Sequence, residues 1–346
     1  MTTEVERVET RDDVEAIYEQ YYASNWTDGL PIIPPTAERV ERMLAGAKRD
    51  RHELIGVLEP KKGEATVETI AVNAVMAGCR PEYLPVLIAA TEALADPALN
   101  LYSILTATHN VSPLAIVSGP IARRLDVNCG EGQAPNRWRA SATIGRAIQL
   151  LTINVAGIPG GTHIDTQGPM GRYYNAMAEN EEESPWEPLH AERGFRPEQS
   201  TVTIFAANPA QHIDDVGSNT PQSILHTMAN AIATGGNRNM HGPGEPLLVL
   251  GLQHANTIGK AGWSKLDAKR FLYENARIRH VDFPPGNESA ISEEWRKYFV
   301  ANATTGMPCA GRPEDIVILV IGGSGTHSLF VQTVLGCWSV TRLIEE

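Results

Sequence analysis

The chain of 346 residues lacks an apolar run long enough to cross a membrane. Its longest purely apolar run covers residues 316–321, whereas a spanning helix needs about 20 residues. The N-terminal segment is acidic and has no apolar core of the kind found in secretory signals. These absences predict a protein that does not associate with membranes and works in the cytoplasm.

Cysteine, basic residues and aromatic residues are also scarce. The four cysteines lie far apart and form no Cys-x-x-Cys motif, so we expect reduced, mostly buried thiols. Twenty-nine basic against 41 acidic residues give a net charge of −12, which repels phosphate backbones and predicts no nucleic-acid partner. An aromatic content of 6% also argues against surfaces on which single-stranded bases stack.

Several helices can be predicted from apolar spacing and end signals. The clearest covers residues 67–77, where an apolar stripe begins after the N-cap residue Thr66 and stops at Gly78. Pro81 opens a further helix that runs to about residue 95. A helix over 141–151 is apolar around much of its circumference.

Three continuous apolar runs, residues 113–118, 246–250 and 316–321, each lead into a glycine-containing turn. Such runs are typical of buried strands, and helical patterns precede the first two. The chain is therefore predicted to be an α/β protein with layered sheets and helices. Its strand-loop-helix units form a degenerate repeat.

The sequence predicts two lobes that follow a short N-terminal part. Residues 1–36 form an N-terminal helix and a proline-rich arm, 37–195 the first α/β lobe, and 196–346 the second. The acidic, proline-rich stretch from 179 to 200 carries few aliphatic residues. We expect it to be a long surface loop between the lobes, of the type that often borders a site.

The most informative motif is the loop that follows the third apolar run. Open α/β folds bind ligands where strands end, because backbone amides converge there. Gly322, Gly323 and Gly325 allow the backbone to approach an anion closely, and Ser324 and Ser328 add polar side chains. The loop matches neither a P-loop nor a dinucleotide fingerprint. It predicts a site that binds an anionic substrate.

Histidines at strand ends are the candidate proton carriers. His327 lies in this loop, and His254 follows the second apolar run, so we expect one of them to be the general acid/base. His109, just before the first run, is a third candidate. A surface or structural role is the alternative for each of them.

Three further polar residues are candidates for binding the substrate. Asn73 and Arg146 lie within apolar helical patterns, where they either orient a carboxylate substrate or join an internal hydrogen-bond network. Glu179 begins the acidic stretch and is placed to line the mouth of a cleft.

Two His-x-Asp pairs leave the question of a metal open. His163 with Asp165, and His212 with Asp214, would each point to one side of a strand and could grip a metal ion. In the alternative, the aspartate only orients a surface imidazole.

Two other functions remain open on the sequence alone. Cys79 lies between Gly78 and Arg80 near a predicted helix start, where a thiolate is electrostatically favoured. Cys79 or Cys337 could therefore serve a redox enzyme component. The third possibility is a non-catalytic subunit that only binds a ligand.

Several strings of the chain resemble one protein family. They are residues 25–31 (NWTDGLP), 71–83 (AVNAVMAGCRPEY), 178–186 (AENEEESPW), 262–265 (GWSK) and the loop 322–328. They are similar to the C-terminal region of the bacterial UGSC family, some members of which carry a Sec-Gly-Ser-Cys motif. The resemblance covers about residues 25–346. This chain has no such motif, so the family's redox residues have no counterpart here. The resemblance implies one half of a two-part enzyme, with the other half supplied by a separate partner subunit.

Taken together, the sequence predicts an enzyme that acts on a small, anionic metabolite by acid/base chemistry of the lyase or hydrolase type. It also predicts a homo-oligomer, with a dimer favoured, because a helix that is apolar on several sides must be covered on several sides. The tryptophan-bearing loop 184–195 is expected near the interface or the mouth of the site.

Overall fold

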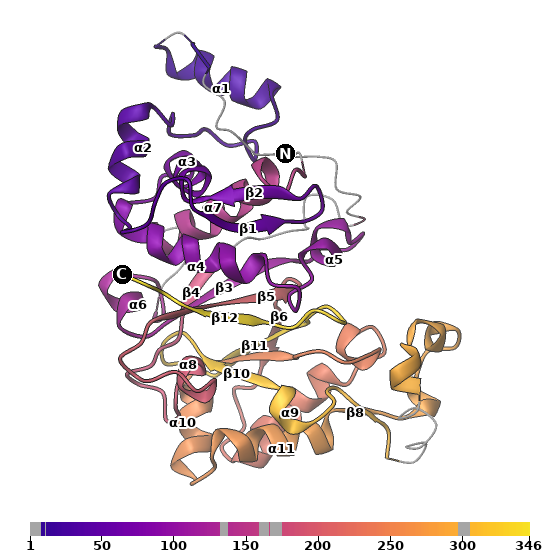
Figure 1. Cartoon of the computed structure of the whole chain (residues 1–346). Coiled ribbons are helices and arrows are strands. Elements are labelled where there is room, and N and C mark those ends of the chain that lie inside the picture. The colour runs from indigo at the N-terminus through magenta and orange to yellow at the C-terminus, as the bar shows by residue number, and fades with distance from the viewer. Residues whose placement is uncertain (1–7, 11, 132–137, 159–165, 167–174, 297–304) are drawn as a thin grey trace.

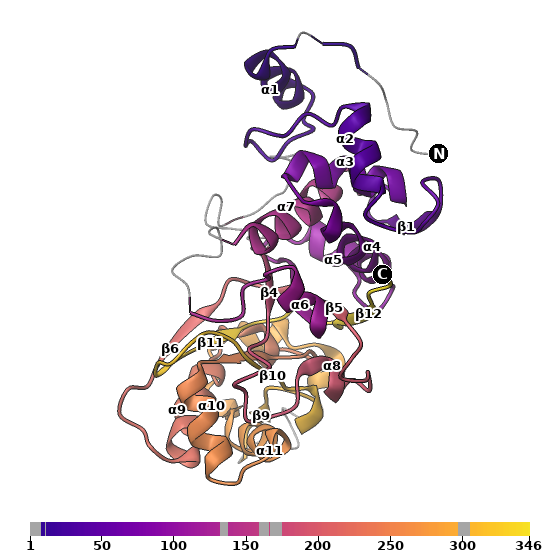
Figure 2. The same cartoon turned by 90° about the vertical axis from the view of Figure 1, so that its left-hand side faces the viewer.

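The computed structural model describes residues 8–10, 12–131, 138–158, 166, 175–296 and 305–346. The protein is an α/β structure in which two four-stranded sheets lie between two layers of helices (Figure 1). Turned by 90°, Figure 2 shows the same layers, with α4 and α7 above the strands and α9, α10 and α11 below.

The first sheet has the order β4-β3-β5-β12 and the second the order β10-β7-β11-β6. The strands of the first sheet are β3 (Ser112–Ser118), β4 (Asn175–Ala178), β5 (Thr201–Ala207) and β12 (Val340–Leu343). Those of the second are β6 (Gln211–Asp214), β7 (Leu247–Leu250), β10 (Val317–Val320) and β11 (His327–Val331).

The two sheets repeat one pattern of pairing and exchange their fourth strands. In each, a parallel pair (β3 with β4, β7 with β10) is followed by two antiparallel pairings. After β5 the chain crosses to the second sheet as β6, and after β11 it crosses back to the first as β12. A bridge between Ala207 and Thr333 joins the two crossing points. This repeat differs from the one predicted from sequence, which had three strand-loop-helix units: β7 and β10 lie in one sheet, and β10 is followed by β11 and not by a helix.

Helices cover the outer face of each sheet. The first layer contains α2 (Ala37–Leu44), α3 (Val67–Ala77), α4 (Leu84–Leu94) and α7 (Arg139–Asn154), and the second α9 (Pro221–Ile232), α10 (Leu252–Lys260) and α11 (Lys265–Asn275). Alternate residues of a strand point to opposite faces. Thus Ala115 and Val117 of β3 pack on the helices, whereas Leu114 and Ile116 join the core between the sheets.

The described chain also contains shorter elements. Among them are α1 (Val14–Ala23), α5 (Leu101–Thr106), α6 (Pro120–Arg124), α8 (Leu189–Glu192), and two small two-stranded antiparallel sheets, β1 (Leu54–Leu58) with β2 (Gly63–Thr66) and β8 (Arg277–Ile278) with β9 (Met307–Pro308). Thr66 caps α3 through a reciprocal hydrogen-bond pair with Thr69, and Gly78 ends the helix in a left-handed conformation. The predicted helix 67–77 is confirmed.

Three expectations differ from the structure. The boundary at residue 195 does not divide the sheets, because β5 and β12 both belong to the first sheet. The stretch 179–200 is not simply a surface loop, since Glu179, Trp186 and His190 are buried in it. The helix around 141–151 is α7, and α3 with strands β3 and β4 packs against it, so its apolar faces do not require a second copy.

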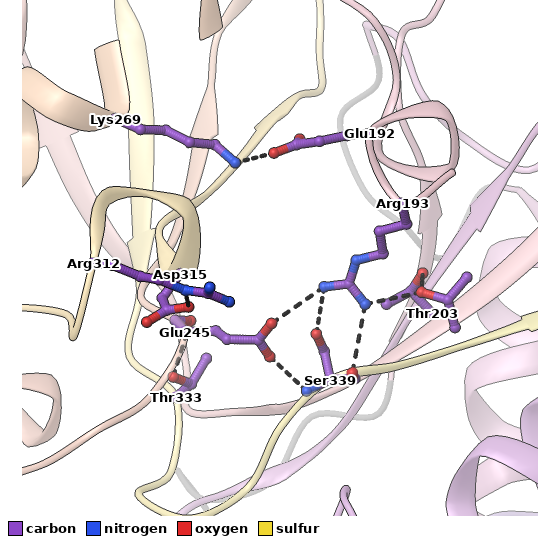
Figure 3. A network of polar contacts seen from close by, with 10 residues as sticks. Glu192, Arg193, Thr203, Glu245, Lys269, Arg312, Asp315, Thr333 and Ser339 are labelled. Carbon is purple, nitrogen blue, oxygen red and sulfur yellow. Dashed lines mark hydrogen bonds and ion pairs between the residues drawn. The ribbon is translucent and has the colours of Figure 1, made fainter. Parts of the chain in front are cut away.

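A polar network fixes the return crossing to the first sheet (Figure 3). The guanidinium of Arg193 donates to Ser339 Oγ at 2.6 Å and to Thr341 Oγ1 at 2.9 Å, and pairs with Glu245 at 3.3 Å. The second oxygen of Glu245 accepts the Ser339 amide at 2.5 Å. The exchanged strand β12 is thereby tied to the segment that leads into β7.

None of the helices among the described residues is both long and apolar enough to cross a bilayer.

Candidate active site

The loop that follows β10 meets two other segments of the chain. Gly322 has φ +98°, a value that favours glycine, and its amide donates to Cys129 O at 2.8 Å. Asn180, just beyond β4, donates its side-chain amide to Gly322 O at 3.2 Å and its backbone amide to Val320 O at 2.8 Å. The ends of β4 and β10 are joined here, and the segment 128–131 lies beside them.

The glycine loop binds a carboxylate of the chain itself. Ser324 donates both its backbone N–H, at 3.2 Å, and its hydroxyl, at 3.1 Å, to Glu131 Oε1. A Cβ on Gly323 would lie 1.7 Å from Glu131 Cγ, so this approach requires glycine. Glu131 is exposed. The loop is therefore able to bind an anion, as its glycines predict, and an exposed side chain occupies that position.

His327 stands at the beginning of β11, three residues beyond Ser324. Its Nδ1 lies 3.3 Å from Asp214 Oδ1 on the neighbouring strand β6, and the two side chains are 58% and 63% exposed. The His212 ring lies beside it, with 5.1 Å between ring centroids. A carboxylate on Nδ1 orients the imidazole and leaves Nε2 as the nitrogen that faces away. This is the arrangement of an accessible acid/base group.

His254 hydrogen-bonds to Ser328, the residue that follows His327, but its environment differs from that of His327. It is 1% exposed, with Nδ1 at 2.9 Å from Ser328 Oγ and Nε2 at 3.0 Å from Asp215 O. Because a carbonyl oxygen only accepts, Nε2 carries the proton, and in the neutral ring Nδ1 accepts from the Ser328 hydroxyl. Ser328 Oγ also accepts the Gly251 amide at 3.3 Å. Of the two histidines predicted as the acid/base, His254 supports the loop and His327 faces solvent.

Glu179 lies at the same strand ends but below the surface. It is 4% exposed, and burial raises its pKa from 4.5 to about 7. One of its oxygens accepts the Leu189 amide, at the start of α8, at 2.6 Å. Glu179 thus holds α8 against the sheets and is not on the wall of an open cleft.

The remaining predicted residues lie away from this site. Arg146 clasps Asp28 through two hydrogen bonds of 3.0 and 2.9 Å and also donates to Pro31 O, so it fastens the N-terminal arm. Asn73 lies in α3, within the helical layer on the far side of the first sheet. His109 precedes β3 and so lies at the opposite end of that strand from the converging loops.

The cysteines do not have the environment of reactive thiols. Burial raises the pKa of Cys79 to about 12, and its sulfur donates to Thr143 O. Burial also raises the pKa of Cys337 to about 11 and that of Cys309 to about 12, and the pKa of Cys129 is raised by burial and by nearby glutamates. A thiolate near Cys79, as the redox alternative requires, is disfavoured.

Within the described part of the chain, no three His, Cys, Asp or Glu side chains are grouped so as to hold a metal ion. His163 and Asp165 lie outside the described residues. His212 and Asp214 do share one face of β6, and there the aspartate pairs with His327.

Glu131 and the partnership of Asp214 with His327 were not foreseen, and Asn180 was considered only as a neighbour of Glu179 at the mouth of a cleft. Asp214 was visible only as part of a His-x-Asp pair. Glu131 carried one weak signal, its place between Gly130 and Gly132.

No model of a known protein family matches this chain, and no curated protein matches it either.

Proposed function

We propose that the chain is an enzyme that acts on a small, anionic metabolite by acid/base chemistry of the lyase or hydrolase type. One observation carries the proposal: the exposed His327–Asp214 pair stands beside a glycine loop whose Ser324 already binds a carboxylate. Two residues separate Ser324 from His327, so their Cα atoms, three positions apart, lie within about 11 Å of one another. A small molecule is able to reach both.

Each group has a definite part in the proposed reaction. The substrate's carboxylate replaces Glu131 at the N–H and O–H of Ser324. His327 Nε2 then takes a proton from the substrate or returns one, while Asp214 on Nδ1 stabilises the imidazolium that forms. Amides of residues 323–325 stabilise negative charge as it develops, since the Gly322 amide is already bonded to Cys129 O.

The other predictions from the sequence accompany this one as proposals. The partner is a small molecule and not a nucleic acid, and the strings that resemble the UGSC family suggest a separate partner subunit as well. The four cysteines are all unpaired, which favours a reducing compartment such as the cytoplasm. A homodimer is retained as a proposal, without the support of α7, which the chain itself covers.

The role of His327 is tested by the consumption of metabolites. The purified protein is incubated with a cell metabolite extract and with a panel of small carboxylates, and consumed compounds are followed by mass spectrometry. His327→Ala should slow the consumption about 10²- to 10⁴-fold, because a positioned acid/base group contributes that much. His52→Ala, which removes an exposed histidine of the first half, is the matched control and should not change the rate. Equal rates for wild type and His327→Ala would remove His327 from the mechanism.

The place of the substrate's carboxylate is tested by binding. Glu131→Ala removes the internal competitor, and Gly323→Ala drives the Glu131 side chain away because of the 1.7 Å clash. Each should tighten the binding of the carboxylates that the wild type consumes, by about tenfold, since a hydrogen bond to a charged group contributes about 1.5 kcal/mol. Ser324→Ala should weaken it. The same affinity in all three variants would contradict the assignment.

A further inference from the structure

A cavity of about 490 Å³ lies in the helical layer of the first half, away from the proposed active site. Its walls come from α1, α2, α3 and α7 and from the segment between α1 and α2. Its volume lies within the range of about 300–1,000 Å³ that is usual for small-molecule sites. Neither Ser324 nor His327 lines it.

The polar part of its lining is a fixed chain of amides. Asn154, the last residue of α7, donates one N–H to Asn73 Oδ1 at 2.8 Å and the other to Trp26 O at 3.1 Å. Asn73 in turn donates to Thr69 O at 2.8 Å. These bonds fix which atom of the Asn154 amide is the oxygen. That oxygen, Oδ1, is buried and accepts no hydrogen bond.

Asn154 borders the cavity, but its Oδ1 has no accessible surface and therefore does not face the space that a ligand would fill. The chain of amides contributes a rigid wall. Asn73, predicted from sequence to hold a substrate, serves here to orient Asn154.

Much of the remaining lining is apolar or aromatic. Tyr21 and Trp26 meet edge to face, with 5.3 Å between ring centroids, and Val40, Val72 and Met76 complete this wall. Such a wall suits the apolar body of an organic molecule and not a bare ion.

The charged residues that line the cavity have an excess of negative charge. Arg51 pairs with Glu41 at 2.7 Å and with Glu68 at 2.5 Å, so two carboxylates face one guanidinium. No other described lining residue is charged. An anionic ligand would be repelled, whereas a neutral or singly cationic one would not.

We propose that this cavity is a second binding site. It takes a neutral or singly cationic organic molecule with an apolar body. Its selectivity is opposite in charge to that of the proposed active site, which takes anions.

The test uses three probes of one shape and different charge: phenethylamine (cationic), phenylacetamide (neutral) and phenylacetate (anionic). Binding to the full chain is followed by saturation-transfer NMR and calorimetry. The amine and the amide should bind, and phenylacetate should bind at least tenfold more weakly than either. Absence of binding by both the amine and the amide, or equal binding of all three probes, would overturn the proposal.

Variants locate the site. Val72→Phe fills the cavity and should weaken both binding probes at least tenfold. Glu68→Gln tests the charge of the lining and leaves the bonds among Asn73, Asn154 and Trp26 in place. It should weaken phenethylamine several-fold and leave phenylacetamide unchanged, with the exposed Glu82→Gln as its matched control.

A last variant separates this proposal from the proposed function. His327→Ala should bind the amine and the amide as the wild type does, whatever it does to catalysis. Loss of probe binding in that variant, or unchanged binding in Val72→Phe, would place the probes elsewhere and overturn the assignment.

Discussion

The loops after β4 and β10 leave related positions of the two sheets and carry opposite chemistry. The first begins Glu179-Asn180-Glu181, and the second Ile321-Gly322-Gly323. The acidic loop supplies carboxylates: Glu181 accepts the Gly119 amide at 2.7 Å and is only 23% exposed. The glycine loop supplies amides, and the carboxylate that they hold is on an exposed side chain.

The difference between the two strand ends is therefore one of exposure. In the first half, a half-buried carboxylate of the chain accepts the Gly119 amide at the end of β3. In the second, the anion is removable, and a solvent-facing histidine stands next to it. A duplicated scaffold can stabilise the fold at one end and bind substrate at the other, because function depends on the groups at the site more than on the fold.

The glycines at the two strand-helix junctions should show the largest effect on stability. A Cβ on Gly119 would lie 2.3 Å from Gln199 O, and one on Gly251 would lie 2.3 Å from His327 O. Overpacking of this kind costs about 1–3 kcal/mol. Gly119 also has φ +84°, which adds about 1–2 kcal/mol for alanine, whereas Gly251 has φ −63°.

In urea unfolding, Gly119→Ala should therefore be less stable than wild type by about 4 kcal/mol and Gly251→Ala by about 2. Gly217→Ala is the control, because a Cβ there meets nothing within 4 Å. If Gly251→Ala were the more damaging change, the backbone argument would be wrong.

Burial of Glu179 should make the stability depend on pH. Its pKa is raised from 4.5 to about 7, so the fold favours the protonated form. The stability that this gives is fully present below pH 4.5 and is lost as the pH rises through 7. The total is on the order of 3 kcal/mol.

Glu179→Gln keeps an acceptor for Leu189 but cannot ionise. The difference in unfolding free energy between wild type and this variant should change by that amount between about pH 4.5 and pH 8. The exposed Glu187→Gln should show no such change. A difference that stays constant across this range would mean that Glu179 ionises as it does in water.

The smallest expected effect on stability is the difference between Glu181 and Glu131, the two carboxylates that accept these backbone amides. Glu181→Gln keeps an oxygen for the Gly119 amide but loses the charge, which should cost about 1 kcal/mol. Glu131→Gln, on an exposed side chain, should change the stability by less than about 0.5 kcal/mol. Urea unfolding of the two variants measures both losses of stability. Equal losses would contradict the distinction between the half-buried Glu181 and the exposed Glu131.

Local signals predicted much of this architecture. Helix α3 could be bounded to the residue because Thr66 and Gly78 have backbone roles that neighbours do not override. Strands β3, β7 and β10 were visible as apolar runs because both of their faces are buried. β6 was missed, since Gln211–Asp214 is short and mostly exposed and is a strand only through pairing with β11.

The site was predictable in its loops and not in its partners. The rule that α/β folds bind ligands where strands end selected Gly322–Gly325 and His327. It could not find Glu131, which lies far away in the sequence and is brought in by the packing of the two sheets. A polar residue in an apolar helical pattern, such as the half-buried Arg146, indicates only that a partner exists. The fold decides that this partner is Asp28.

The exchange of β6 and β12 makes the two halves of this chain complementary fragments and not independent domains. A break in the exposed turn between β6 and α9 would leave one fragment without β12 and the other without β6. Each fragment alone would then present the open edge of β5 or β11, and such an edge pairs readily with other chains. When the two fragments associate, β6 pairs with β11 and β12 pairs with β5, so neither edge stays open.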